Sequence, residues 1–196
     1  MNTVSFVIIA TALLWPAAAS AQLNVLISGG FSGAYEQLLP EFERTSGIKV
    51  TTGSGASQGA GPQTIAARLA RGVPANVAIP GSTSGIWLRT DLFPRLGIAE
   101  KINVKVAPRG TDATRMVAAA DADLAVMPVS EIVHAAGVDF AGSIAPEIQF
   151  VQVFCAAVVA GSGEIEGSKR LIEFLASARA SEAIRNSGME PPATAR

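Results

Sequence analysis

Apolar runs that end in glycine and serine, each followed by a helix-like stretch, constrain the fold of this chain more than any other feature. Three such runs, at residues 23–28, 48–52 and 75–79, are rich in aliphatic and β-branched side chains and predict buried strands. Apolar side chains with the spacing of a helix follow the first run, between Ala34 and Phe42. The alternation of strand, Ser/Gly loop and helix predicts an α/β fold.

The remaining chain continues this alternation. Pro62 is expected in the first turn of a helix that ends before Gly72, and leucines spaced by four predict a helix over residues 88–96. Thr111 can cap a further helix, and Leu171 belongs to a late amphipathic one. Three more strands are expected, at residues 102–106, 124–127 and 151–159.

The first residues predict an exported protein. Residues 4–18 are an almost continuous apolar run, too short for a comfortable membrane span, and Ala19-Ser20-Ala21 matches the small-residue cleavage signal. We therefore expect residues 1–21 to be a signal peptide that is cleaved near Ala21, and the mature protein to be periplasmic or secreted.

The composition argues against several classes of function. The formal net charge is −1 and the 15 basic residues are scattered, so no nucleic-acid partner is expected. His134 and Cys155 are the only residues of their types, which leaves no ordinary His/Cys metal cluster and no internal disulfide. We expect neither a metal nor another cofactor.

Ser/Gly loops follow three of the expected strands, and these loops are the candidate binding site. In open α/β sheets ligands bind outside the carboxyl ends of the strands, where hydroxyls and helix N-terminal N–H groups can hold an anion. The loops carry no Lys or Arg, so a neutral site for a small anion is expected; ordinary turns are the alternative. The candidate residues are Ser28, Gly29, Gly30, Ser54, Ser57, Ser82 and Ser84.

The second loop also contains Gly55-Ala56-Ser57-Gln58-Gly59, the G-x-S-x-G pattern of a hydrolase nucleophile. That motif requires a helix to begin directly after the serine, and here the stretch Gly59-Ala60-Gly61-Pro62 intervenes. A catalytic triad would also have to use His134. We therefore expect a binding protein without catalytic residues, and a serine hydrolase remains the alternative.

Segments spread over nearly the whole chain carry a family resemblance. They are LNVLISGGFSGAYEQLLPEFERTSGIKV, ARLARGVPANVAI, TSGIWLRTDLFPRLGIAEKI, DADLAVMPVSEI, AAVVAGSGEIEGSKRLIEFLAS and IRNSGMEP. Together with the signal peptide, they resemble exported solute-binding proteins of the molybdate-binding type, which are type 2 periplasmic binding proteins.

The resemblance implies a fold, a ligand class and a partner. It implies two small three-layer αβα lobes around a cleft, with a βαβαβ lobe at residues 22–80 and a second lobe with the closing helices at residues 81–196. It implies a small anionic ligand, such as molybdate or a similar oxyanion, and delivery by a monomer to an ABC-type permease in the inner membrane. Besides Ser28, Ser57 and Ser84, it implies ligand contacts near Thr111 and Ser130.

One departure from the family pattern follows residue 80. Residues 77–80 run directly into the loop at residues 81–84, whereas family members hold more of the first lobe and a crossover strand between these points. We therefore expect a shortened hinge and first lobe. A shortened relative that no longer supports transport is a further alternative.

Overall fold

The computed structural model of the chain describes residues 21–82, 85–107 and 110–192. Residues 1–20, which make up most of the expected signal peptide, and the candidate ligand residue Ser84 lie outside these ranges. Within them, no helix combines the length and the apolar character that crossing a membrane requires.

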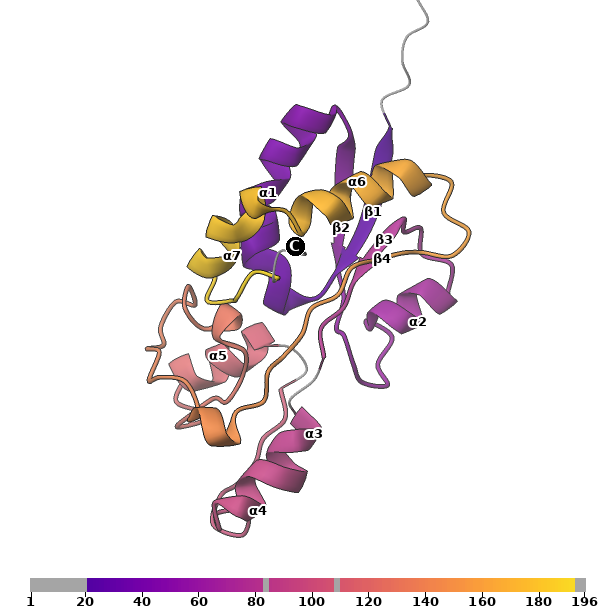
Figure 1. Ribbon diagram of the computed structural model, residues 1–196. Coiled ribbons are helices and arrows are strands. Elements are labelled where there is room, and N and C mark those ends of the chain that lie inside the picture. Colours follow the sequence, from indigo (N-terminus) through magenta and orange to yellow (C-terminus); the bar gives the residue numbers. More distant parts are fainter. Residues whose placement is uncertain (1–20, 83–84, 108–109, 193–196) are drawn as a thin grey trace, which may run out of the picture.

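The fold is built on one sheet of four strands in the order β2-β1-β3-β4 (Figure 1). β1 (Gln22–Ile27), β2 (Lys49–Ser54) and β3 (Val77–Ile79) are parallel, and β4 (Ala157–Val158) runs antiparallel to β3. Ile27 pairs with the last residue of both neighbouring strands, so the three parallel strands end at one level. The predicted α/β fold is confirmed.

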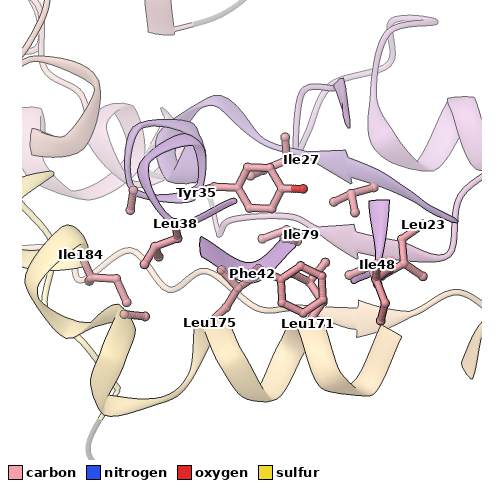
Figure 2. Packing of buried hydrophobic residues seen from close by; sticks show 14 residues of the cluster. Leu23, Ile27, Tyr35, Leu38, Phe42, Ile48, Ile79, Leu171, Leu175 and Ile184 are labelled. Atoms are coloured by element: carbon pink, nitrogen blue, oxygen red, sulfur yellow. The ribbon is translucent and has the colours of Figure 1, made fainter. Parts of the chain in front are cut away.

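One face of the sheet carries the main core. The helices α1 (Gly29–Ser46), α6 (Ile165–Leu175) and α7 (Ser181–Asn186) pack on this face, and Figure 2 shows their apolar side chains meeting those of the strands. The core therefore joins residues 23–79 to the C-terminal helices. Its buried members include Leu23, Val25, Ile27, Tyr35, Leu38, Phe42, Ile48, Val77, Ile79, Leu171, Leu175 and Ile184.

The opposite face is covered by α2 (Ile65–Ala70). Leu26 and Ala78 point to this side and pack on Ile65, because successive side chains of a strand alternate between the two faces. The sheet thus has helices on both faces, as the expected three-layer arrangement requires.

The ends of the first two helices follow from single residues. Gly47 ends α1 in the left-handed conformation, with φ of 71°, and its N–H donates to the carbonyl of Glu43. Thr64 caps α2 by accepting a hydrogen bond from the N–H of Ala67 at 3.1 Å. The expectation that Pro62 lies in the first turn of α2 is therefore wrong, because the threonine sets a later start.

The middle of the chain, residues 85–150, is mostly helical turns and extended segments. Its helices are α3 (Gly85–Trp87), the π-helical turn η1 (Leu88–Leu92), α4 (Phe93–Arg95) and α5 (Gly110–Ala118), followed by the 3₁₀ turns η2 (Val129–Glu131) and η3 (Pro146–Ile148). A last 3₁₀ turn, η4 (Ala178–Ala180), precedes α7. Thr111 lies inside α5 rather than capping it, since that helix begins at Gly110.

Two strands expected in this middle part are not formed. Residues 102–106 and 124–127 lack strand pairing, and Val106 and Leu124 are 69% and 68% exposed. A strand requires a hydrogen-bonded neighbour, and within the described ranges neither segment has one. The described residues therefore form one sheet, and the second sheet expected for the lobe after residue 81 is not formed. The lobe boundary at residue 80 stays a prediction.

The expected strand at residues 151–159 forms in part. Its residues 153–155 pair antiparallel with residues 80–82, and we call this pair of segments the connecting ladder. The N–H of Ser82 donates to the carbonyl of Val153 at 2.8 Å, and the N–H of Cys155 donates to the carbonyl of Pro80 at 3.1 Å. Only β4, further along the same run, belongs to the sheet.

Phe154 of the connecting ladder packs against two glycines at the carboxyl edge of the sheet. A Cβ atom on Gly30 would lie 2.5 Å from the Phe154 ring, and one on Gly81 would lie 2.6 Å from it. Phe31 packs beside the same ring, with 6.0 Å between the centroids. Both glycines are therefore needed for the ring to reach the sheet edge.

The core predicts a contrast between two leucines. Leu171→Ala should destabilise the protein by about 2–5 kcal/mol, because Leu171 is 1% exposed and the substitution leaves a cavity. Leu124→Ala makes the same chemical change at a residue that is 68% exposed, and should alter stability by about 0.5 kcal/mol or less. Urea unfolding followed by circular dichroism measures both, and equal losses would contradict the packing of α6 on the sheet.

The contact of Phe154 with Gly81 predicts a non-additive pair. Gly81→Ala should cost about 1–3 kcal/mol, because the new Cβ overlaps the ring. In a Phe154→Ala background the same substitution should cost clearly less, with a coupling of at least about 0.5 kcal/mol. Gly163→Ala, where no heavy atom lies within 4 Å of the new Cβ, is the control. Additive effects in a double-mutant cycle would show that the ring does not contact this glycine.

Candidate functional site

The first two Ser/Gly loops and the described start of the third, Gly81 and Ser82, meet at the carboxyl edge of the parallel strands. The N–H of Ser28 donates to the carbonyl of Ile79 at 3.0 Å, and the N–H of Gly55 donates to the carbonyl of Ile27 at 2.9 Å. Each loop is thus fixed by the strand beside it. This edge is the place where a doubly wound sheet binds ligands.

The first loop is shorter than expected. The sequence predicts a loop over residues 28–32, but α1 begins at Gly29, directly after the N-cap residue Ser28. The N–H of Phe31 donates to the carbonyl of Ser28 at 3.3 Å, whereas the N–H groups of Gly29 and Gly30 have no acceptor among the described residues, and the Ser28 hydroxyl makes no capping bond. Ser28 is 7% exposed and directly precedes α1. Its hydroxyl and the first N–H groups of the helix therefore form one compact set of hydrogen-bond donors at the end of β1.

The second loop is closed at its base and linked to the third. The N–H of Ala56 donates to the carbonyl of Gln63 at 3.1 Å, which pairs the two ends of the loop. Inside it, Ser57 Oγ accepts a hydrogen bond from the N–H of Gly81 at 2.8 Å. Because that bond uses a lone pair of the hydroxyl, the Ser57 O–H hydrogen remains to be donated elsewhere.

Ser54 and Ser82 play structural roles at the same edge. The carbonyl of Ser54 accepts a hydrogen bond from the guanidinium of Arg68, and the residue is exposed. Ser82 Oγ accepts from the N–H of Val153 at 2.9 Å, so its hydroxyl belongs to the connecting ladder. Neither serine is arranged as clearly for a ligand as Ser28 and Ser57 are.

Arg68 corrects the expectation of a site without positive charge. The loops themselves carry no basic residue, but helical side chains lean toward the N-terminus of their helix, and Arg68 of α2 reaches back to the second loop. Its Nη2 atom would lie 3.3 Å from a Cβ on Gly53. Arg68 follows the capping residue Thr64 by four positions, and this helical spacing is the signal in the sequence that could have placed its side chain near the second loop.

The middle of the chain adds η2 to this edge and leaves Thr111 away from it. Ser130 Oγ is buried and has no hydrogen-bond partner among the described residues. The neighbouring Glu131 carboxyl lies against the start of α1, because a Cβ on Gly29 would lie 2.9 Å from Glu131 Oε1. Thr111 is exposed on α5, and its backbone carbonyl accepts a hydrogen bond from the Thr114 hydroxyl.

The environment of Glu131 changes its acidity. Burial raises the pKa of the Glu131 carboxyl above its ordinary value of 4.5, because the charged form loses solvation. No motif in the sequence points to Glu131, although it directly follows the candidate Ser130. A carboxyl that holds its proton more firmly than usual therefore lies beside the N-terminus of α1.

A cavity lies beside the loops, and the serines of the loops do not line it. It has a volume of about 730 Å³, and Ser130 is the candidate ligand residue that lines it. Its wall is mainly apolar and includes Phe31, Trp87, Met127, Phe150, Phe154 and Met189. An anion requires several convergent donors, so the loop edge fits such a ligand better than this cavity does.

The hydrolase alternative lacks its serine–histidine pair. Ser57 Oγ accepts from a backbone N–H, and His134 Nε2 lies 3.1 Å from the carbonyl oxygen of Asn186. No hydrogen bond joins the two side chains in the described part of the chain. A nucleophilic serine would instead be bonded to the base that removes its proton.

Comparisons with solved structures agree with this fold. The periplasmic molybdate-binding protein of Azotobacter vinelandii is similar with a TM-score of 0.66 and 18% identity, over 87% of this chain and 100% of that one. A substrate-binding domain from Clostridium difficile is similar with a TM-score of 0.63 and 14% identity, over 89% of this chain and 100% of that one. At these identities the likeness concerns the fold alone.

Comparisons of sequence add a relative and a family. Aconitate isomerase from a Pseudomonas species is 25% identical over 229 residues, which cover 86% of this chain and 87% of the relative. That aligned length exceeds the 196 residues of the chain, so the alignment opens gaps in this chain. Residues 87–190, more than half of the length, match the model described as bacterial extracellular solute-binding protein. The chain therefore belongs to the bacterial extracellular solute-binding protein family.

Proposed function

We propose that this protein is the exported solute-binding component of an ABC-type importer, and that it binds a small anionic solute at the carboxyl edge of its sheet. The observation that carries the proposal is the uncapped start of α1. There Ser28 and the first-turn N–H groups lie beside a strand edge that also presents Ser57. Membership of the family supports the solute-binding role.

The chemistry of this edge suits an anion held by hydrogen bonds. The N-terminus of a helix of 18 residues carries a partial positive charge and unpaired donors. Ser28 adds a hydroxyl without an internal partner, and Ser57 adds one whose orientation is set by Gly81. Arg68 supplies a cation at the second loop. A molybdate-like oxyanion or a small carboxylate fits this set of donors.

The setting of the proposal is the periplasm. A signal peptide cleaved near Ala21 would release the mature chain as a monomer, and an ABC-type permease in the inner membrane would receive the solute. The family and its molybdate-binding structural relatives support this setting. In the second part of the chain, Ser84, Thr111 and Ser130 remain proposed contacts.

Ser28→Ala tests the proposal directly. The wild type should be stabilised by at least one of molybdate, tungstate, sulfate and small carboxylates in a thermal-shift panel, because binding to the folded state raises stability by RT ln(1 + [L]/Kd). Ser28→Ala removes a hydroxyl without an internal bond, so the unliganded protein should change little. A lost hydrogen bond to a charged ligand, about 1.5–3 kcal/mol, should weaken binding by roughly 10- to 100-fold.

Ser181→Ala is the matched control. This serine begins α7, away from the loops, so the variant should bind like the wild type. A panel in which no anion shifts the melting of the wild type contradicts the proposed function. Affinities weaker than about micromolar throughout would favour the alternative of a shortened relative that no longer supports transport.

Isomerisation of a bound carboxylate is a second candidate function. The observation that favours it is the relative named aconitate isomerase, whose match covers 86% of this chain. If the activity is shared, incubation with one isomer of aconitate should yield the other by proton NMR, and Ser28→Ala should slow the reaction by at least about tenfold through weaker binding. Conversion no faster than in buffer would leave binding as the function.

A further inference from the structure

The carboxyl of Glu131 lies against the helix start that would hold the anion. η2 packs on α1, and the position of a Cβ on Gly29 is 2.9 Å from Glu131 Oε1. Any larger residue at position 29 would displace the carboxyl, so the glycine is what lets Glu131 approach. The acid therefore lies beside the same first-turn N–H groups that the proposed function assigns to the ligand.

Among the residues that the structure describes, no charged group compensates Glu131. Within the described ranges it has no ion pair, and its carboxyl makes no hydrogen bond, not even to the N–H groups beside it. The first two turns of α1 carry no titratable group before Tyr35. At the end of α7, Arg185 is exposed, and next to η2 the ring of His134 is bonded to the carbonyl of Asn186. The carboxyl thus lies partly buried beside the backbone at the start of α1.

Two ionised anionic groups side by side at this partly buried helix start repel each other. An anion on the first turn of α1 would lie next to the Glu131 carboxylate, and two anionic groups that share a site raise the pKa of one of them. A single proton between the two groups removes the repulsion and adds a hydrogen bond. Burial already raises the pKa of Glu131, which makes it ready to hold that proton.

We propose that the solute is bound together with one proton that lies between it and the Glu131 carboxyl, so that Glu131 determines which anions the site accepts. This inference rests on the proposed function and defines its substrate class. Anions that carry a hydroxyl or an acidic hydrogen already hold the hydrogen that lies between the two groups, and they donate it as a hydrogen bond to the ionised carboxylate. Fully ionised anions bind only when Glu131 takes up a proton from water.

Sulfate and malate distinguish the two cases. Sulfate is fully ionised from about pH 5 to about pH 8, so its affinity should fall by about tenfold for each pH unit above the pKa of Glu131. Malate carries a hydroxyl that can donate to the carboxylate, so its affinity should change much less over the same range. Titration calorimetry in two buffers with different ionisation enthalpies counts the protons: one taken up with sulfate above that pKa, and none with malate.

Glu131→Gln isolates the carboxyl. The amide cannot ionise, so sulfate binding should become independent of pH and exceed that of the wild type at high pH. Glu182→Gln makes the same charge change at an exposed residue of α7 and should keep the wild-type profile. The proton count on the wild type requires no variant, so it decides the question even if Glu131→Gln is poorly folded.

The outcomes separate this inference from the proposed function. If anions bind with the same pH profile in the wild type and in Glu131→Gln, and without proton uptake, this inference is wrong and the proposed function stands. If no anion binds the wild type at any pH, the proposed function fails and this inference fails with it. Proton uptake with sulfate that is lost in Glu131→Gln and kept in Glu182→Gln supports both.

Discussion

The central position of β1 is the constraint on which the rest of the structure depends. It pairs with β2 on one side and with β3 on the other, and its alternate side chains pack on helices at both faces. Because both neighbours run parallel to it, all three strands leave the sheet at one level. The start of α1, the second loop and the connecting ladder are consequently brought together there, although tens of residues separate them in the chain.

The charges at this edge are unlike those of a simple oxyanion pocket. The N-terminus of α1 and the guanidinium of Arg68 favour negative charge, whereas the Glu131 carboxyl opposes it. A solute that satisfies both sides has an anionic end and a hydrogen that it can donate. The Phe154 ring, packed against Gly30 and Gly81, fills space at the same edge.

The sequence predicts the sheet and the meeting of its loops because both depend on local pattern. Apolar runs mark β1, β2 and β3, and parallel strands necessarily end at the same edge. Glu131 and Phe154 could not be found in this way, since each reaches the edge from a segment between 73 and 124 residues away from the glycines it contacts. Glycines 29, 30 and 81 indicated that something approaches the backbone closely, but a glycine does not say what approaches.

The unpaired segments of the middle part show where local pattern fails. Residues 102–106 and 124–127 have strand-like composition, yet a strand exists only when a neighbour accepts its hydrogen bonds. Apolar side chains of these segments, such as Val106 and Leu124, therefore remain exposed. The connecting ladder at the end of this part and η2 within it still lie at the sheet edge. They carry Phe154 and Glu131, so both residues are held at this edge although the described residues form no second sheet.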